Sequence, residues 1–274
     1  LKAPTGFSGF DLFRYIKESF SKTNAGVGLM IMAIGGFVAY IDKIGASNAL
    51  VFVAMKPLKL FKKYPYVAAS LVIPIGQLLF VAIPSAAGLG LLLMASMFPI
   101  LVNLGVSRLS AVSVITATTA FGIGPASAIT ASATDIAGVD TISFFLKSQI
   151  PMVIPLSIVM MVTYYFVNRH FDKKIALDTE ALANEKKEIK VPLVYAFIPI
   201  LPIVLLIVFS KIFNLFNTAI ALDTTTAMFI SVFIALLFEF ARTQNTKAVL
   251  ESLKIFWNGM GNIFKTVVTL IIAA

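Results

Sequence analysis

Two interruptions decide how this apolar chain folds: Ile83-Pro84-Ser85-Ala86-Ala87-Gly88 and Phe121-Gly122-Ile123-Gly124-Pro125-Ala126-Ser127. Each combines proline, glycine and a small hydroxyl residue, and neither contains a charged side chain. In water both stretches would be ordinary turns. In a bilayer, irregular backbone is stable only where protein or a water-filled cavity satisfies its polar groups. Two such breaks in neighbouring segments predict a binding site built from half-helix ends, which is typical of secondary transporters.

The composition indicates that this chain folds in a membrane. Of its 274 residues, 59% are hydrophobic and 13% are charged, with a mean hydropathy of +0.94, whereas soluble domains contain about 25% charged residues. Cysteine is absent and His170 is the single histidine, which excludes a disulfide framework, a thiolate metal site and a histidine metal cluster. The net charge of +9 is better explained by lysines in cytoplasmic loops than by nucleic-acid binding.

The two ends of the chain interrupt sequence patterns that would be expected to continue. Leu1 stands in place of an initiator methionine, and the last residues lie inside an apolar run. We therefore expect an all-α integral membrane protein that is truncated at both ends.

Residues 1–65 are predicted to form scaffold elements. Residues 1–23 are amphipathic and suit an interfacial helix, whereas residues 24–41 form a first span that Asp42 and Lys43 close. Residues 44–63, with a row of lysines and Pro57, suit a second interfacial helix. Small residues in the first span favour close helix packing rather than ligand binding, and they are Gly26, Gly28, Gly35 and Gly36.

Residues 66–138 are predicted to form the transport domain, which begins with two apolar arms around the first break. The arms cover residues 66–83 and 89–104, and Pro74 and Pro99 would kink them. At 1.5 Å per residue, an arm of about eighteen residues extends ~27 Å, nearly the hydrocarbon thickness. The arms could be two ordinary spans joined outside the membrane, or a re-entrant hairpin whose tip stops inside it.

The second break divides a helix into residues 109–121 and 126–137. Its unwound segment exposes carbonyls that bind cations, and the restarting helix offers free N–H groups that bind anions. Asp135 is the only acid near this break in sequence, and we expect it beside Asp140 at the outer interface. Helix-to-helix hydrogen bonding explains about half of the nearby hydroxyls. These hydroxyl residues are Ser110, Ser113, Thr116, Thr118, Thr119, Ser127, Thr130, Ser132 and Thr134.

The second half of the chain is predicted to contain further spans around a charged loop. Residues 139–191 contain a span, at 151–168, and a lysine- and arginine-rich loop, at 169–190, which the positive-inside rule assigns to the cytoplasm. Residues 256–274 echo residues 20–37, which favours an inverted repeat that is incomplete here. Residues 192–274 then hold the scaffold spans of the second repeat, at 192–213, 223–239 and 255–274.

Five short motifs carry a resemblance to a known family. They are Gly36-Phe37-Val38-Ala39-Tyr40, Ile44-Gly45-Ala46, Gly76-Gln77-Leu78, Ile83-Pro84-Ser85-Ala86-Ala87-Gly88-Leu89 and Leu104-Gly105-Val106-Ser107. The chain resembles the DcuC family of anaerobic C4-dicarboxylate carriers, in the ion-transporter superfamily with the divalent anion–sodium symporters. The resemblance covers nearly the whole chain, and the motif around Pro84 is its most specific part. It implies a re-entrant hairpin tip that faces an unwound loop, with a dicarboxylate and a coupling cation between them.

The resemblance also implies site residues. Ser85, Ala86 and Ala87 stand where the symporter branch has Ser-Asn-Thr, so two side-chain contacts to a carboxylate are lost and the substrate and sodium use stay open. Sodium would contact Ser85, Gly122 and Gly124; a proton is the alternative coupling ion, and no other cofactor is expected. The implied substrate-binding residues are Ser85, Ala86, Ala87, Gly88, Gly124, Pro125, Ala126, Ser127 and Thr130.

The two breaks predict secondary active transport, and the resemblance implies that the substrate is a C4-dicarboxylate, such as succinate, fumarate or malate, moved by exchange or cation coupling. The hairpin domain would move as a body, like an elevator, in the bacterial inner (cytoplasmic) membrane. Membrane lipid and a homodimer partner that packs on residues 24–41 are expected. The closest alternative is a transporter of another small organic solute, such as an amino acid. A channel would need a continuous polar stripe and an enzyme a catalytic constellation, and the sequence shows neither.

Overall fold

The computed structural model describes residues 14, 17–61, 63–173, 191–209 and 222–273, and the regular elements within them are all helices. The chain is an all-α integral membrane protein, as its composition predicts. The interfacial helix expected at residues 1–23 and the charged loop at 169–190 lie mostly outside the described residues. Among the described residues, five helices are long and apolar enough to cross a membrane, and they are Ala25–Lys43, Pro65–Ala82, Ala86–Asn103, Thr141–Asp172 and Thr224–Thr243.

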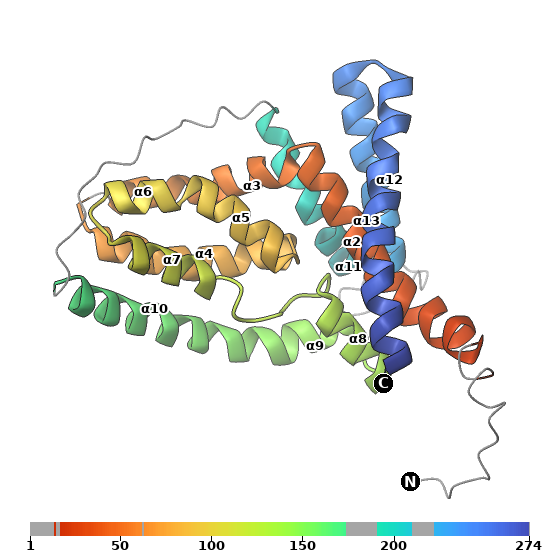
Figure 1. Cartoon of the computed structure of the whole chain (residues 1–274), viewed down its shortest axis with the longest axis horizontal. Coiled ribbons are helices and arrows are strands. Elements are labelled where there is room, and N and C mark those ends of the chain that lie inside the picture. The colour runs from red at the N-terminus through yellow and green to blue at the C-terminus, as the bar shows by residue number, and fades with distance from the viewer. Residues whose placement is uncertain (1–13, 15–16, 62, 174–190, 210–221, 274) are drawn as a thin grey trace, which may run out of the picture.

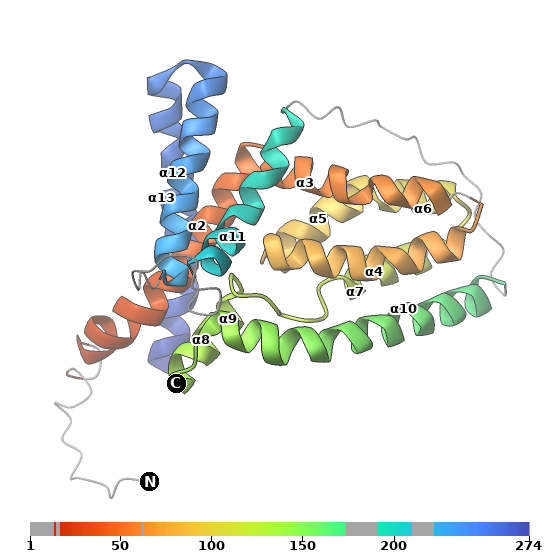
Figure 2. The ribbon, with the colours of Figure 1, turned by 180° about the vertical axis from the view of Figure 1, so that it is seen from behind.

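The helices form two groups that run across each other (Figures 1 and 2). The first group, which we name the hairpin body, contains α3 (Ala46–Met55), α4 (Pro65–Ala82), α5 (Ala86–Ser96), α6 (Phe98–Asn103), α7 (Arg108–Ala117) and α10 (Ile150–Asp172). The second, the crossing body, contains α2 (Leu29–Lys43), α11 (Leu201–Val208), α12 (Thr224–Thr243) and α13 (Thr246–Ala273). The remaining, shorter elements are η1 (Ser19–Gly28), η2 (Lys56–Phe61), α8 (Ala128–Ala137), α9 (Thr141–Phe144), η3 (Phe145–Gln149) and η4 (Leu193–Ile200).

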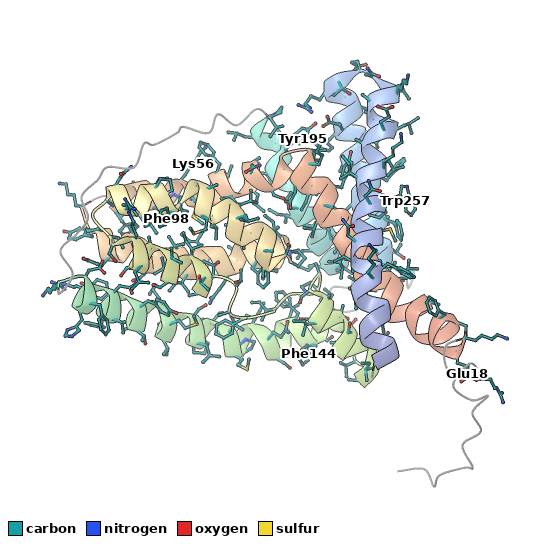
Figure 3. All side chains as sticks on the ribbon, in the orientation of Figure 1. Glu18, Lys56, Phe98, Phe144, Tyr195 and Trp257 are labelled. Atoms are coloured by element: carbon teal, nitrogen blue, oxygen red, sulfur yellow. The ribbon has the colours of Figure 1, made fainter. Side chains whose placement is uncertain are left out.

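Close packing of α2 on α13 depends on glycine. A Cβ atom added at Gly259 would lie 2.6 Å from Ala39 Cβ, and one added at Gly36 would lie 2.7 Å from Met260 Cγ. The packing interpretation of the glycines is therefore right at Gly36. In this contact α13 covers the α2 face at Gly36, and the expected homodimer stays a prediction. The other side of α13 carries Trp257, which is 55% exposed and points away from the bundle (Figure 3).

The two arms of the first break are helical, as predicted. The arm α4 begins at Pro65 and contains Pro74, whereas the second arm is divided at Met97 into α5 and α6. Pro99 occupies the first turn of α6, and Met97 keeps helical dihedral angles, so α5 and α6 together form one interrupted arm near the predicted kink. Between the arms the chain turns sharply at Pro84, where the Ser85 N–H donates to Ile83 O at 2.7 Å.

Four predicted helix boundaries differ from the structure. The helix α7 ends at Ala117 rather than at residue 121, because the next amides bond three residues back and tighten its last turn. The helix α8 begins at 128 rather than 126, after Pro125, and α13 begins at 246 rather than 255. The span predicted at 192–213 starts as the 3₁₀-helix η4, in which Pro199 lacks the N–H of an α-helical bond; its residues 210–213 lie outside the described part.

Candidate functional site

The hairpin tip is a helix N-terminus that ends in small side chains. Ser85 has an extended backbone and caps α5, because its Oγ accepts a hydrogen bond of 3.1 Å from the Gly88 N–H. Ala86 and Ala87 are exposed, whereas Ser85 and Gly88 are partly buried. The first amides of a helix have no partner within it and form the positive end of its dipole. The tip can therefore receive an anion without any basic side chain.

The second break lies against the arm that leads to this tip. A Cβ atom added at Gly76 would lie 2.2 Å from Thr118 Cγ2, and one added at Gly124 would lie 2.9 Å from Val81 Cγ1. Residues 118–127, which we name the break loop, therefore follow α4 toward its last turn. Gly124 also has a φ of +108°, a left-handed conformation that disfavours other residues. The structure thus brings the second break beside the end of α4, immediately before the hairpin tip.

A ring of hydrogen bonds fixes the shape of the break loop. The Gly124 N–H donates to Gln149 Oε1 at 3.2 Å, and Gln149 Nε2 donates to Thr130 Oγ1 at 2.9 Å. Thr130 Oγ1 donates in turn to Gly122 O at 3.3 Å, and Ser127 Oγ reaches the same carbonyl at 3.5 Å. The hydroxyls of Thr130 and Ser127 thus hold the loop. Gln149 was not predicted as a site residue. The one feature of the sequence that could have indicated it is a neutral amide near the start of a long apolar helix.

The two halves of the predicted site differ in exposure. Gly124, Pro125, Ala126, Ser127 and Thr130 are buried, while the tip is open at its two alanines. The buried loop is also attached to the crossing body, because Thr224 Oγ1 of α12 donates to Pro125 O at 3.4 Å. The loop therefore supplies a fixed wall, and the α5 N-terminus supplies the accessible polar groups.

An acid that the sequence analysis did not connect with the site lies against the tip. A Cβ atom added at Gly88 would lie 3.3 Å from Asp42 Oδ2 and 3.0 Å from Ser85 Oγ. The prediction about Asp135 concerned the second break, whereas Asp42 lies at the first. Asp135 is exposed on α8, as expected for an interfacial residue. Asp42 does end α2 next to Lys43, as predicted, but this end of the helix meets the hairpin tip.

Three threonines at the end of α7 and the start of the break loop have local partners. Thr116, Thr118 and Thr119 each donate to a backbone carbonyl three or four residues back. These hydroxyls are therefore bonded within their own segment rather than between helices, as was predicted for about half of the hydroxyls. At the start of the helix, Ser107 and Ser110 bind the carboxylate of Asp172 instead, at the opposite end of the hairpin body from the tip (Figure 1).

Comparison with known proteins identifies the family. The DcuC family, described as C4-dicarboxylate anaerobic carriers, matches residues 2–274. The chain belongs to the DcuC family. The DcuC anaerobic C4-dicarboxylate transporter of Escherichia coli (strain K12) is 33% identical over 273 residues, which cover 100% of this chain and 58% of that protein. A probable DcuC transporter of Vibrio cholerae is 35% identical over 265 residues, which cover 96% of this chain and 57% of that protein.

The match to the DcuC family tests two predictions made from the sequence, which are the family resemblance and the class of protein. It confirms the resemblance seen around Pro84 and its companion motifs, and the relatives are named as transporters rather than enzymes. This chain spans less than two thirds of the length of these DcuC relatives. No solved structure matches it.

Proposed function

We propose that this chain forms one half of a secondary transporter of C4-dicarboxylates in the bacterial inner membrane. The observation that supports the proposal is the packing of Gly124 against Val81, in the last turn of α4, because α5 begins a few residues further along the chain. Membership of a family of C4-dicarboxylate carriers supplies the substrate class. Succinate, fumarate and malate each present two carboxylates to such a site.

Helix-end electrostatics supply the affinity in this proposal. One substrate carboxylate meets the first amides of α5 after Ser85, where a helix N-terminus stabilises an anion by about 0.3–2 kcal/mol. The second carboxylate meets the start of α8 after Ser127. The hairpin is re-entrant in this scheme, so α4 and α5 bring the tip to mid-membrane, where water is scarce and each polar contact is stronger.

Alternating access follows from the division into two bodies. The hairpin body carries the tip and moves against the crossing body in an elevator-like motion, coupled to a cation or to exchange with a second dicarboxylate. The helix α10 packs along α4, and this packing holds the helices of the hairpin body together so that they can move as a unit. A homodimer interface would form on a surface other than the α2 face at Gly36, which α13 of the same chain covers.

Exchange of radiolabelled succinate in proteoliposomes tests the proposal. We expect Ser85→Trp to abolish exchange, because the indole fills the space in front of the α5 amides. Leu91→Trp is the matched control, since Leu91 is 72% exposed on the same helix. Arginine serves as the rival substrate. Undiminished succinate exchange by folded Ser85→Trp protein, or transport of arginine in place of succinate, would contradict the proposal.

A further inference from the structure

Gln149 lies on the face of α10 that is turned toward the rest of the hairpin body. It ends the π-helix η3 within the continuous helix Thr141–Asp172, and the Ile150 N–H donates to Phe145 O five residues back. One extra residue in a turn changes the direction of the side chains around it, and such π-helical turns are frequent at functional sites. Gln149 stands four residues before Val153, the first buried residue of α10, so the two side chains share the inner face of the helix.

The Gln149 carboxamide can serve its two partners in one orientation only. The Gly124 N–H is a donor, so Gln149 Oε1 must face it, and Gly124 N lies 3.2 Å from Oε1. The Nε2 atom then donates to Thr130 Oγ1 at 2.9 Å, which leaves the Thr130 hydroxyl proton to donate to Gly122 O at 3.3 Å. Each bond fixes the direction of the next, so an apolar side chain in place of the carboxamide would release the loop and Thr130 together.

The start of α8 depends on these bonds because it has no side-chain cap of its own. Ser127 is the N-cap residue of α8 but makes no side-chain bond to it, and its hydroxyl reaches Gly122 O at 3.5 Å instead. In α5, by contrast, the Ser85 hydroxyl caps the first turn directly. Thr130 is the third residue of α8, and Gln149 holds its hydroxyl. The direction of the first α8 amides is therefore set from α10 rather than from within α8.

We propose that Gln149 is a positioning residue that gives this site its preference for a dicarboxylate over a monocarboxylate. This inference rests on the proposed function, in which one substrate carboxylate meets the tip and the second meets the start of α8. Gln149 acts on the second carboxylate through Thr130 and Gly124, by aiming the first amides of α8. A monocarboxylate occupies the tip alone, where Ser85 caps α5 without help from α10. The binding of the second carboxylate is thus the step that needs Gln149.

A role in stability alone would affect substrates differently. Loss of a purely structural residue weakens the binding of every substrate to the same degree, whereas loss of a positioning residue for one carboxylate weakens only substrates that carry it. Specificity is a difference between two affinities, so it reports the second case directly. Succinamate, the monoamide of succinate, has the same chain length and one carboxylate in place of two. A comparison of these two compounds isolates the contribution of the second carboxylate.

Calorimetric titration of purified protein in nanodiscs with succinate and with succinamate tests the inference. We expect wild type to bind succinate about fivefold more tightly than succinamate. Gln149→Met keeps the length of the side chain and removes both hydrogen bonds. It should weaken succinate binding about fivefold and leave succinamate binding unchanged, so that the preference is lost. Ser148→Ala is the control, because Ser148 is exposed in the same π-helix, and it should keep the wild-type preference.

Two variants of Thr130 approach the same hydrogen bond from α8. Thr130→Val removes the hydroxyl, whereas Thr130→Ser keeps it. We expect Thr130→Val to lose the succinate preference and Thr130→Ser to retain it. The double variant Gln149→Met, Thr130→Val should lose no more than either single variant, because both changes break the same bond. This pair of Thr130 variants decides the result if Gln149→Met fails to fold.

The outcomes separate this inference from the proposed function. Equal weakening of succinate and succinamate binding by Gln149→Met, or an unchanged preference in that variant, would overturn the positioning role and leave the transport proposal intact. Equal binding of the two compounds by wild type would also overturn the positioning role, because the second carboxylate would then gain nothing at α8. A wild-type protein without saturable succinate binding would overturn the transport proposal itself, and this inference with it.

Discussion

The helices α5 and α7 begin in similar ways at opposite ends of the hairpin body, yet they differ in how the carboxylate near the first turn is hydrogen-bonded. Both start at a serine cap, Ser85 in α5 and Ser107 in α7, and both have a carboxylate nearby. Asp172 beside α7 is 3% exposed and accepts three hydrogen bonds, from Ser107 N at 2.9 Å, Ser107 Oγ at 2.7 Å and Ser110 Oγ at 2.7 Å. Asp42 beside α5 lies 3.3 Å from the position of a Cβ added at Gly88, and no hydrogen bond joins its carboxylate to α5 within the described residues.

This difference in hydrogen bonding distinguishes a structural anchor, at the start of α7, from the binding site that we propose at the start of α5. A carboxylate whose oxygens are hydrogen-bonded at a helix N-terminus neutralises the dipole and fixes α10 against α7. At the tip, Ser85 satisfies the Gly88 amide, while the amides of Ala86 and Ala87 have no partner within α5 and, in our proposal, receive a substrate carboxylate. Similar local sequence thus serves stability at one end of the hairpin body and, in our proposal, transport at the other.

The largest expected effect is the loss of the anchor. Asp172→Ala removes an acceptor from three hydrogen bonds, and bonds to a charged group contribute about 1.5–3 kcal/mol each without being additive. We expect the free energy of unfolding to fall by about 3 kcal/mol. The measurement is the thermal unfolding midpoint in detergent. Asp42→Asn is the matched comparison, and we expect it to change stability by less than about 0.5 kcal/mol, because no hydrogen bond among the described residues joins the Asp42 carboxylate to α5. Equal destabilisation by both variants would remove the distinction between anchor and site.

A second, smaller effect is expected at the break loop. Gly124→Ala adds a Cβ within 2.9 Å of Val81 Cγ1 at a left-handed φ, so the loop must move away from α4. We expect succinate exchange to fall about tenfold, which corresponds to ~1.4 kcal/mol. Gly105→Ala is the control for backbone strain, because Gly105 has a φ of +96° and no atom within 4 Å. Similar exchange rates for the two variants would show that contact with α4 is unimportant.

The smallest effect is expected at the tip itself. Gly88→Ala places a Cβ at 3.0 Å from Ser85 Oγ and 3.3 Å from Asp42 Oδ2, which pushes the cap and the acid apart by a few tenths of an ångström. We expect succinate affinity to fall about threefold, or ~0.7 kcal/mol. Gly90→Ala makes the same change on α5 with no atom within 4 Å, and should leave the affinity unchanged. Calorimetric titration with succinate compares them, and an equal loss in both would point to a general effect on the helix.

The sequence predicts the two breaks in the helices because each break is caused by residues within it. Pro84 and Ser85 end one helix and cap the next, and Gly124 with Pro125 prevents a helix from continuing. These features are visible in the sequence, and the structure has them. Helix ends are less predictable, as the early end of α7 shows, since tight last turns depend on bonds three residues back rather than four.

The partners of the site residues could not be predicted in the same way. Asp42 precedes the tip by more than forty residues, and Gln149 follows Gly124 by twenty-five. An acid at the end of an apolar span is normally a boundary residue, so only tertiary packing shows that Asp42 meets α5. Likewise, Asp172 lies where the sequence changes from apolar to charged, and its burial depends on the position of α7. Such contacts join segments that are distant in the sequence, so the local hydrophobic pattern does not predict them.

The central claim, that the α5 N-terminus receives the substrate, is tested most directly by protection of a single cysteine. This chain contains no cysteine, so Ala86→Cys introduces one exposed thiol at the tip. Ala95→Cys is the control, because Ala95 is exposed near the other end of α5. We expect saturating succinate to slow labelling of Ala86→Cys by a polar maleimide at least fivefold, about 1 kcal/mol of protection, and to leave Ala95→Cys unaffected. Equal labelling of Ala86→Cys with and without succinate, in protein that still exchanges succinate, would contradict the account.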